Sequence, residues 1–458
     1  MKAIICGAGQ VGHNIAVELA AEKIDVTVID QRADLIQKID ENMDVRAMVG
    51  HASHPDVLEA AGARDCDMLI AVTFADEVNM VACQVAQSLF DVPVKIARLR
   101  ARSYLQPIWS DLFSRDNLPI DVIISPEIEV ANAIGRRLMV PGTFEMIPLA
   151  DDKMRLIGVR CEEDCPILNT PLRELSTLFP DLHFTIVGIV RGEKSIVPNS
   201  DDELMAGDEV YIVVETDHVA RAMAAFGHEE AQARRIVIVG GGNIGLSLAE
   251  NIEAQFSGKL ATLIERDRER AEMVAQACAK TEVINGDALD PEILEEANIS
   301  KAETFIAVTN DDETNILASL LAKRSGATTS IALINSGSYT SLMGPLGIDI
   351  VVNPRTITVS TILQYIRRGR IRSVHSIREN FGEIIEAEAL ETSRLVGTPL
   401  GQIELPPEVI IAAVVHDDEV FMATNELVVS VGDRVVLFAG KGAIKQVEKM
   451  FAVGLDFF

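Results

Sequence analysis

Short apolar runs and amphipathic helical stretches alternate through the first part of the chain. Most runs are continuous rather than alternating with polar residues, as in strands that are buried on both faces of a sheet. The runs expected to form strands are residues 2–6, 26–29, 44–49, 68–72, 94–97 and 121–124. Strands that alternate with helices in short units predict a doubly wound parallel sheet, a Rossmann-like α/β domain, over residues 1–125.

The pattern changes near residues 140–143, where the sequence reads Val-Pro-Gly-Thr. Strand-like runs such as residues 184–190 and 209–214 now follow one another without the long helices that parallel crossovers require. We therefore expect a small α+β lobe over residues 143–227. The polar stretch that follows, residues 228–235, is typical of a linker.

The whole arrangement then starts again. An apolar run at residues 236–239 leads into a second glycine-rich turn, and residues 50–79 align with residues 286–315 without a gap. The aligned segments share the strand end Ala71-Val72-Thr73, which recurs as Ala307-Val308-Thr309. A constant register with identities at strand ends indicates an internal duplication.

The duplication predicts the fold of the remaining chain. Residues 233–352 are expected to form a second Rossmann-like domain and residues 372–453 a second lobe, in which Thr398-Pro399-Leu400 echoes Thr170-Pro171-Leu172. The expected fold class is therefore α/β, with two doubly wound parallel-sheet (Rossmann-like) domains, each followed by a small α+β lobe.

Three glycines, Gly7, Gly9 and Gly12, lie between the first apolar run and the first helical stretch. In a dinucleotide-binding turn the first glycine permits the tight turn, the second lets the backbone approach a pyrophosphate, and the third lets helix and strand pack closely. The N–H groups and the positive dipole end of the helix then face the phosphates. The next apolar run ends at Asp30, whose carboxylate is placed to accept ribose hydroxyls. The motif predicts a nucleotide site, with a purely structural turn as the alternative.

The second copy repeats this motif at residues 240–245, and its next apolar run ends at Glu265. A carboxylate in this position repels a 2′-phosphate, which favours NAD or an adenosine nucleotide over NADP. An arginine close to each carboxylate, Arg32 or Arg266, weakens that preference because an arginine can hold a 2′-phosphate.

The composition narrows the function classes. Aromatic residues make up 4% of the chain and its formal net charge is −28, which disfavours a nucleic-acid partner. The acidity is typical of a soluble protein, and the alternative is a partner with a basic face, such as the cytoplasmic side of a membrane protein. No apolar run approaches the ~20 residues of a membrane span, and no signal peptide is expected. The six cysteines are scattered and Cys161-x-x-x-Cys165 lacks a second ligand pair, so we expect a reduced, cytoplasmic protein without a metal site.

Several motifs together resemble those of a known family. They are Gly7-Ala8-Gly9-Gln10-Val11-Gly12, Val49-Gly50-His51-Ala52-Ser53-His54-Pro55, Ala71-Val72-Thr73 and Glu77-x-Asn79-Met80. With the tandem duplication, they make the chain similar over essentially its whole length to the peripheral regulatory subunits of bacterial Trk potassium-uptake systems. The units of that family are RCK domains (regulators of potassium conductance), also called KTN domains.

The resemblance implies a non-enzymatic protein that is cytoplasmic and peripheral on the inner face of the plasma membrane. It implies a homo-oligomeric ring, a tetramer, docked under a membrane potassium channel-like subunit of the TrkH or TrkG type. Members of the family bind NAD(H), and some bind ATP or ADP. Bound nucleotide would then bias the shape of the ring.

The resemblance also implies which residues contact the nucleotide, and it implies no catalytic residue and no metal ligand. The contacts of the first domain are Gly7, Ala8, Gly9, Gln10, Val11, Asp30, Thr73, Phe74 and Arg98, and those of the second domain are Gly240, Gly242, Asn243, Ile244 and Glu265.

Three positions beside the two expected sites differ between the copies. The pairs, first copy before second, are His51 and Asp287, Phe74 and Asn310, and Arg98 and an apolar residue within 332–334. These differences change charge and stacking beside a nucleotide. The two domains are therefore expected to prefer different ligands, with the first domain the better equipped.

Three features stay open between a ligand role and a structural one. His51 and His54 have the spacing of a metal pair, but no third ligand is visible, so a pocket-lining or capping role is favoured. For Arg98, contact with a phosphate or an adenine and a surface salt bridge are both open. The basic run at residues 367–372 is typical of a solvated connection, with contact to another subunit or to a phosphate as the alternative.

Two functions compete at this point. The tandem design and the absence of a catalytic domain favour a ligand-gated regulatory subunit. The glycine motif by itself is also typical of an NAD-dependent oxidoreductase, which needs an acid or base beside the nicotinamide. The histidines of the lobes, at positions 183, 218, 375 and 416, follow no recognisable catalytic pattern, so the regulatory function is preferred.

Overall fold

The computed structural model describes residues 1–21, 23–114, 116–229, 232–255, 258–354, 356–358, 361–362 and 371–451. The described chain forms two compact units. The first unit contains residues 1–129 and a short segment from residue 354, and the second contains residues 130–353 and the described residues from 361 onward.

The sheet of the first unit is entirely parallel, in the order β3-β2-β1-β4-β5-β6. The strand order reverses between β1 and β4, which is where the carboxyl ends of such sheets bind ligands. The predicted doubly wound parallel sheet is thus confirmed. Its strands are β1 (Lys2–Cys6), β2 (Asp25–Asp30), β3 (Arg46–Val49), β4 (Met68–Ala71), β5 (Val94–Arg98) and β6 (Val122–Ile124).

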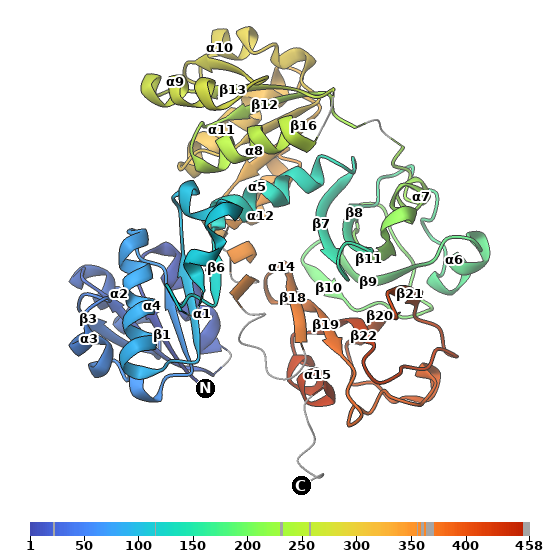
Figure 1. Cartoon of the computed structure of the whole chain (residues 1–458). Helices are drawn as coiled ribbons and strands as arrows, with labels where there is room; N and C mark the ends of the chain where they lie inside the picture. Colours follow the sequence, from blue (N-terminus) through green and yellow to red (C-terminus); the bar gives the residue numbers. More distant parts are fainter. Residues whose placement is uncertain are drawn as a thin grey trace. The chain divides into compact units, whose positions relative to one another are not determined.

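Helices connect these strands and pack against the sheet (Figure 1, blue). Small and aliphatic side chains such as Ile4, Leu69 and Cys83 fill the core between helix and sheet, because the strands are buried on both faces. Helix α5 continues the chain from the first unit into the second. The helices are α1 (Gln10–Ala21), α2 (Ala33–Asn42), α3 (Pro55–Ala60), α4 (Asp76–Phe90) and α5 (Pro126–Arg137), with short 3₁₀ turns at Ala63–Asp65, Arg102–Leu105 and Pro107–Phe113.

A second parallel sheet lies in the second unit, in the order β14-β13-β12-β15-β16-β17. Numbered within its own copy, this order is the same as that of the first sheet, which confirms the predicted second Rossmann-like fold. Its strands are β12 (Arg235–Val239), β13 (Leu260–Glu265), β14 (Glu282–Asn285), β15 (Thr304–Ala307), β16 (Thr329–Leu333) and β17 (Ile350–Val352), and its helices are α8 (Asn243–Gln255), α9 (Arg268–Ala277), α10 (Pro291–Glu296), α11 (Asp312–Arg324) and α12 (Gly337–Leu346), with a 3₁₀ turn at Ile299–Lys301.

Two antiparallel sheets form the lobes, in the orders β10-β9-β11-β8-β7 and β18-β19-β22-β20-β21. If the strands of each lobe are numbered from one to five along the chain, both sheets have the order 1-2-5-3-4. The lobes are therefore duplicated, as the sequence indicated. The first lobe contains β7 (Thr143–Leu149), β8 (Met154–Arg160), α6 (Leu172–Leu178), β9 (Phe184–Arg191), β10 (Lys194–Ile196), β11 (Glu209–Glu215) and α7 (Val219–Ala225), with a 3₁₀ turn at Thr216–His218. The second contains β18 (Ile371–Ile377), α14 (Arg378–Phe381), β19 (Gly382–Glu388), β20 (Val409–His416), β21 (Glu419–Met422), β22 (Arg434–Gly440) and α15 (Ile444–Phe451), with a 3₁₀ turn at Leu400–Gln402.

The two lobes, both in the second unit, share one apolar core. The rings of Tyr211, Phe381 and Phe438 are buried in it together with side chains from both sheets. At its border, Arg434 of the second lobe donates to Asp151 of the first at 2.6 Å. The lobes therefore pack face to face within one chain.

The boundaries of individual elements shift by a few residues from the expected ones. The second strand begins at Asp25 rather than at residue 26, and the third begins at Arg46 rather than at residue 44. Of the basic run, residues 367–370 lie outside the described residues, whereas Arg372 belongs to β18 and pairs with Glu388 at 3.0 Å. Among the helices that are described, none combines the length and the apolar composition that crossing a membrane requires. The exact limits of the four domains stay a prediction.

Candidate nucleotide sites

The first glycine loop joins β1 to α1 in a conformation that excludes larger residues. Gly7 has φ +114°, and a Cβ atom there would lie 2.9 Å from the carbonyl oxygen of Val72. A Cβ atom on Gly12 would lie 1.8 Å from the carbonyl oxygen of Gly7. Gly9 has open space at its Cβ position, so a ligand can approach the backbone there. The three glycines thus have the three separate roles that the motif requires.

Asp30 ends β2 and holds this loop from the side. Its Oδ2 accepts a hydrogen bond from the Ala8 amide at 2.7 Å, and its Oδ1 accepts one from the Arg32 amide at 2.9 Å. A carboxylate oxygen has two lone pairs, so each can accept a further bond from a ribose hydroxyl. The acceptor is therefore held in place by the protein's own backbone.

The second glycine loop repeats this geometry between β12 and α8. Gly240 has φ +101°, a Cβ atom on Gly245 would lie 1.9 Å from the Gly240 carbonyl oxygen, and Gly242 has open space. Glu265 ends β13, and its Oε2 accepts a hydrogen bond from the Gly241 amide at 2.6 Å. The sequence prediction missed Gly241, although it is the residue that joins the loop to the carboxylate.

The structure places the predicted residues of each domain at the carboxyl edge of its own parallel sheet. In the first domain Gly7, Ala8 and Gly9 form the loop, Gln10 and Val11 begin α1, Asp30 ends β2, Thr73 and Phe74 follow β4, and Arg98 ends β5. In the second domain Gly240 and Gly242 form the loop, Asn243 and Ile244 begin α8, and Glu265 ends β13. Their contact with a nucleotide stays a prediction.

A fully buried asparagine ties two strand ends together behind each site. Asn79 Oδ1 accepts hydrogen bonds from the amide and the hydroxyl of Thr73, at 2.8 and 2.7 Å, and its Nδ2 donates to the Arg98 carbonyl at 2.9 Å. Asn315 makes the same bonds with Thr309 and Leu333. These bonds make Leu333 the structural counterpart of Arg98, which the sequence alignment left open within three residues. The amide and the hydroxyl of Thr73 are therefore both hydrogen-bonded within their own domain.

Phe74 and Arg98 have charged neighbours that the sequence did not reveal. The Phe74 side chain is 85% exposed, and the guanidinium carbon of Arg100 lies 4.8 Å from the centre of its ring. Arg98 donates to a carboxylate oxygen of Glu127 at 2.6 Å, and Nε of Arg100 lies 3.4 Å from the same oxygen. Arg98 is thus ion paired in this structure. The signal that could have revealed this cluster is an arginine at the end of β5, a second arginine two residues later, and an acidic residue in the first turn of the helix after β6.

An aspartate at the start of α4 and of α11 distinguishes the two domains. Asp76 Oδ2 accepts hydrogen bonds from the amides of Arg100 and Ala101, while its buried Oδ1 has no partner among the described residues. Asp312 accepts bonds from both the amide and the side chain of Asn335. In the second domain a side chain therefore bonds to the aspartate, whereas in the first domain one buried carboxylate oxygen has no hydrogen bond among the described residues.

The described residues contain no group of three or more His, Cys, Asp or Glu side chains that could hold a metal ion. The rings of His51 and His54 stack with their centres 4.5 Å apart, and Ser53 Oγ lies 2.9 Å from Nδ1 of His51. His54 is the N-cap residue of α3, but its side chain makes no capping hydrogen bond, so the capping role is wrong for His54, whereas a pocket-lining role stays a prediction.

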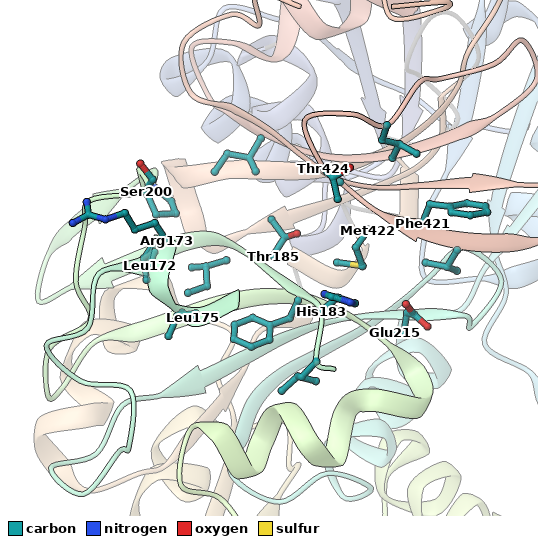
Figure 2. A pocket seen from close by; sticks show the side chains of 18 of the residues that line it. Leu172, Arg173, Leu175, His183, Thr185, Ser200, Glu215, Phe421, Met422 and Thr424 are labelled. Atoms are coloured by element: carbon teal, nitrogen blue, oxygen red, sulfur yellow. The ribbon is translucent and has the colours of Figure 1, made fainter. Parts of the chain in front are cut away.

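A cavity of about 880 Å³ lies between the two lobes of the second unit (Figure 2). Strand β9 and the start of α6 line it from the first lobe, and β21 lines it from the second. His183, Thr185 and Met422 lie beside this cavity, and most other lining residues are apolar. The sequence did not predict this cavity, because it depends on how the lobes pack.

Two family models each match the chain twice. The TrkA-N domain model matches residues 3–126 and 236–354, and the TrkA-C domain model matches residues 156–227 and 384–452. The chain belongs to the TrkA family. Each TrkA-N match contains one glycine loop and its carboxylate, so both candidate sites lie in segments that characterise the family.

Two similar proteins named TrkA align with this chain over its whole length. The Trk system potassium uptake protein TrkA of Azorhizobium caulinodans is 51% identical over 458 residues, and that of Halomonas elongata is 41% identical over 462 residues. Both alignments cover 100% of this chain and 100% of the relative. Both relatives are named as potassium uptake proteins, and each alignment spans both Rossmann-like domains and both lobes of this chain.

Solved structures show the same fold at much lower identity. The GsuK channel bound to NAD gives a TM-score of 0.62 at 18% identity, covering 98% of this chain and 78% of that one. The GsuK RCK domain gives 0.63 at 17% identity, covering 98% and 94%. The likeness supports the tandem RCK fold of this TrkA-family chain.

Proposed function

We propose that the chain is a regulatory subunit that binds NAD(H), and ATP or ADP, and thereby gates a membrane potassium-uptake subunit of the TrkH or TrkG type. The observation that carries the proposal is the pair of glycine loops, each braced by a carboxylate, in a full-length TrkA-family chain. Solved structures of the similar GsuK protein include complexes with NAD and with ADP, which supports this ligand class.

The residues of each site fit an adenine nucleotide. Gly9 and Gly242 leave room for a pyrophosphate to approach the backbone at the start of a helix, where N–H groups and the helix dipole favour negative charge. Asp30 and Glu265 offer free lone pairs to the ribose hydroxyls. In the first domain, the exposed ring of Phe74 is available for stacking on a base.

Regulation requires that a nucleotide binds one conformation of the subunit better than another, since a ligand shifts an equilibrium only by its differential affinity. We propose that the chain assembles as a tetramer, peripheral on the cytoplasmic face of the membrane, and transmits this shift to its membrane partner. In this function the chain performs no chemistry on the nucleotide, which distinguishes it from an NAD-dependent oxidoreductase.

The test is potassium flux into vesicles that hold the membrane subunit, with and without this chain, NADH and ATP. We expect flux to depend on the nucleotide, and Asp30→Ala to shift the NADH response to about tenfold higher concentration, because the ribose loses a charged acceptor. Asp25→Ala removes the same charge at the other, exposed end of β2 and should leave the response unchanged.

Two results would contradict the proposal. If potassium flux responds to none of the nucleotides, the hypothesis that a nucleotide regulates the membrane subunit is wrong. Robust turnover of NAD with hydroxy acids or aldehydes, followed by absorbance at 340 nm, would favour the oxidoreductase instead. A thermal unfolding measurement of Asp30→Ala without ligand separates lost binding from lost folding, because Asp30 also holds the Ala8 amide.

A further inference from the structure

Arg270, on the first turn of α9, reaches across to the second glycine loop. Its Nε donates a hydrogen bond to the carbonyl oxygen of Gly241 at 2.5 Å. Among the residues that the structure describes, its Nη atoms have weak or distant acceptors, Sδ of Met273 at 3.1 Å and Oδ1 of Asn243 at 3.5 Å. A guanidinium carries five donors in a fixed fork, so most of this one is available to a stronger acceptor. The charge lies beside the loop that faces the proposed nucleotide.

In the first domain the equivalent position on the helix is apolar, and the nearby Arg32 pairs with Asp34. Helices α2 and α9 have the same length and follow the strand-ending carboxylates Asp30 and Glu265 at the same interval. With these helices superposed, Leu35 occupies the position of Arg270. The two carboxylates hold their loops in the same way, through one loop amide each. The same superposition pairs Arg32 with Asp267, so both positions differ in charge. Of these arginines, Arg270 bonds to its glycine loop and Arg32 pairs with Asp34.

A guanidinium at this place favours the ligand with more negative charge on its phosphates. A terminal phosphate carries about −1.5 to −2 charges near neutral pH, whereas each phosphate of NAD is a diester with a single charge. Charge-assisted bonds from arginine to phosphate are roughly twice as strong as neutral ones. A 2′-phosphate is disfavoured, because the carboxylate of Glu265 lies where the ribose hydroxyls would bind.

The opposite side of the second site also differs from the first. The exposed Phe74 has Asn310 as its counterpart, and Arg98 has Leu333. The second site thus lacks the exposed ring that would stack on a base and the cation of Arg98, while it gains a cation beside its phosphate loop. The loss of the ring and the gain of the cation at Arg270 both reduce the advantage of a dinucleotide over a nucleoside polyphosphate.

We infer that Arg270 is a specificity-determining residue of the second site and makes it favour ADP or ATP over NAD(H). This inference rests on the proposed function and assigns its two ligand classes to different domains. The first site, with Leu35 in place of the arginine, keeps NAD(H).

The experiment is calorimetric titration of the full chain with ADP, NADH, NADPH and adenosine. An Asp30→Ala background isolates the second site, and a Glu265→Ala background isolates the first. In the first background, Arg270→Leu should weaken ADP binding about tenfold and leave adenosine binding unchanged, while Arg270→Lys keeps most of the ADP affinity. In the second background, Leu35→Arg should strengthen ADP binding at the first site.

Arg268→Leu is the matched control, because this substitution removes the same charge from the same helix turn. The side chain of Arg268 pairs with Glu272 and not with the glycine loop. The inference is overturned if Arg270→Leu binds ADP as tightly as Arg268→Leu does. It is also overturned if ADP and adenosine lose affinity equally, since Arg270 would then only support the loop, or if NADPH binds the second site more tightly than ADP.

The proposed function and this inference fail in different ways. If the wild-type chain binds none of these nucleotides, the proposed function fails. If it binds NADH and ADP but Arg270→Leu has no selective effect, only the assignment of Arg270 fails. Thermal unfolding without ligand identifies a variant that has lost its fold, and Arg270→Lys then remains as the test of charge.

Discussion

The two Rossmann-like domains share their frame and differ at the carboxyl edge of the sheet, where the candidate sites lie. Asn79 and Asn315 are both fully buried and make the same hydrogen bonds to two strand ends. Outside this frame, Arg98 has Leu333 as its counterpart, and the loop contact of Arg270 has none in the first domain. Side chains in the frame are fixed by packing and by buried hydrogen bonds, whereas those at the open edge are free to change. One fold can therefore hold two sites of different chemistry.

The lobes show the same relation on a smaller scale. In the first lobe Arg191 donates to both oxygens of the buried Asp208, and in the second lobe His416 takes the place of the arginine and bonds to the buried Asp433 at 2.6 Å. Both aspartates also accept a backbone amide from three residues earlier. The frame is again kept, while a permanent charge is exchanged for a titratable one.

The largest expected effect tests whether the glycine loops are equivalent. Gly12→Ala and Gly245→Ala would place a Cβ atom 1.8 and 1.9 Å from a carbonyl oxygen. Each should destabilise its own domain by about 3 kcal/mol, because backbone atoms must move. Urea unfolding measures this, with fluorescence of the single tryptophan, Trp109, reporting on the first unit and circular dichroism on the whole chain.

Gly9→Ala is the control for this comparison, since no atom lies within 4 Å of its Cβ position. It should leave the unfolding midpoint nearly unchanged. Gly245→Ala should move the circular dichroism transition more than the Trp109 transition. Equal midpoints for Gly9→Ala and Gly12→Ala would show that the close approach of helix and strand is not essential.

The next effect tests the shared frame. Asn79→Ala and Asn315→Ala each remove a buried side chain that bonds to two strand ends, and each should cost about 2 kcal/mol because amides and carbonyls lose their partners. Asn42→Ala, at the exposed end of α2, should change stability by less than about 0.5 kcal/mol. Chemical denaturation of the three variants measures the difference, and a clearly unequal cost at the two buried positions would break the equivalence.

The smallest effect tests the difference between the lobes. The hydrogen bond and the charge of Asp433 raise the pKa of His416 above its usual 6.5, and the charge of Asp417 adds a smaller increase. The ion pair therefore stabilises the fold fully below about pH 6.5 and loses that contribution as the pH rises through the higher, folded-state pKa. We expect the thermal unfolding midpoint of the wild type to fall slightly over this range. His416→Arg, which copies the first lobe, should flatten that slope, and an unchanged slope would remove His416 as its source.

Hydrophobic periodicity and the glycine spacing were enough to predict that two parallel-sheet domains alternate with two lobes along the chain. They also predicted the loops at Gly7 and Gly240. These features are local, because each depends on residues that are neighbours in the sequence or on a repeat that the sequence displays directly. The carboxylates Asp30 and Glu265 were placed correctly at strand ends for the same reason. The predicted nucleotide contacts themselves still await the titrations above.

The neighbours of these residues depended on contacts between distant parts of the chain. Glu127 pairs with Arg98, and Arg100 lies over Phe74, only because parallel strands bring their carboxyl ends to one edge. The face-to-face packing of the lobes and the cavity between them likewise follow from how two finished sheets bury their apolar faces. The sequence determined that there are two Rossmann-like folds and where their glycine loops lie. Tertiary structure decided which charges surround each loop, because side chains far apart in sequence meet only after the sheets have formed.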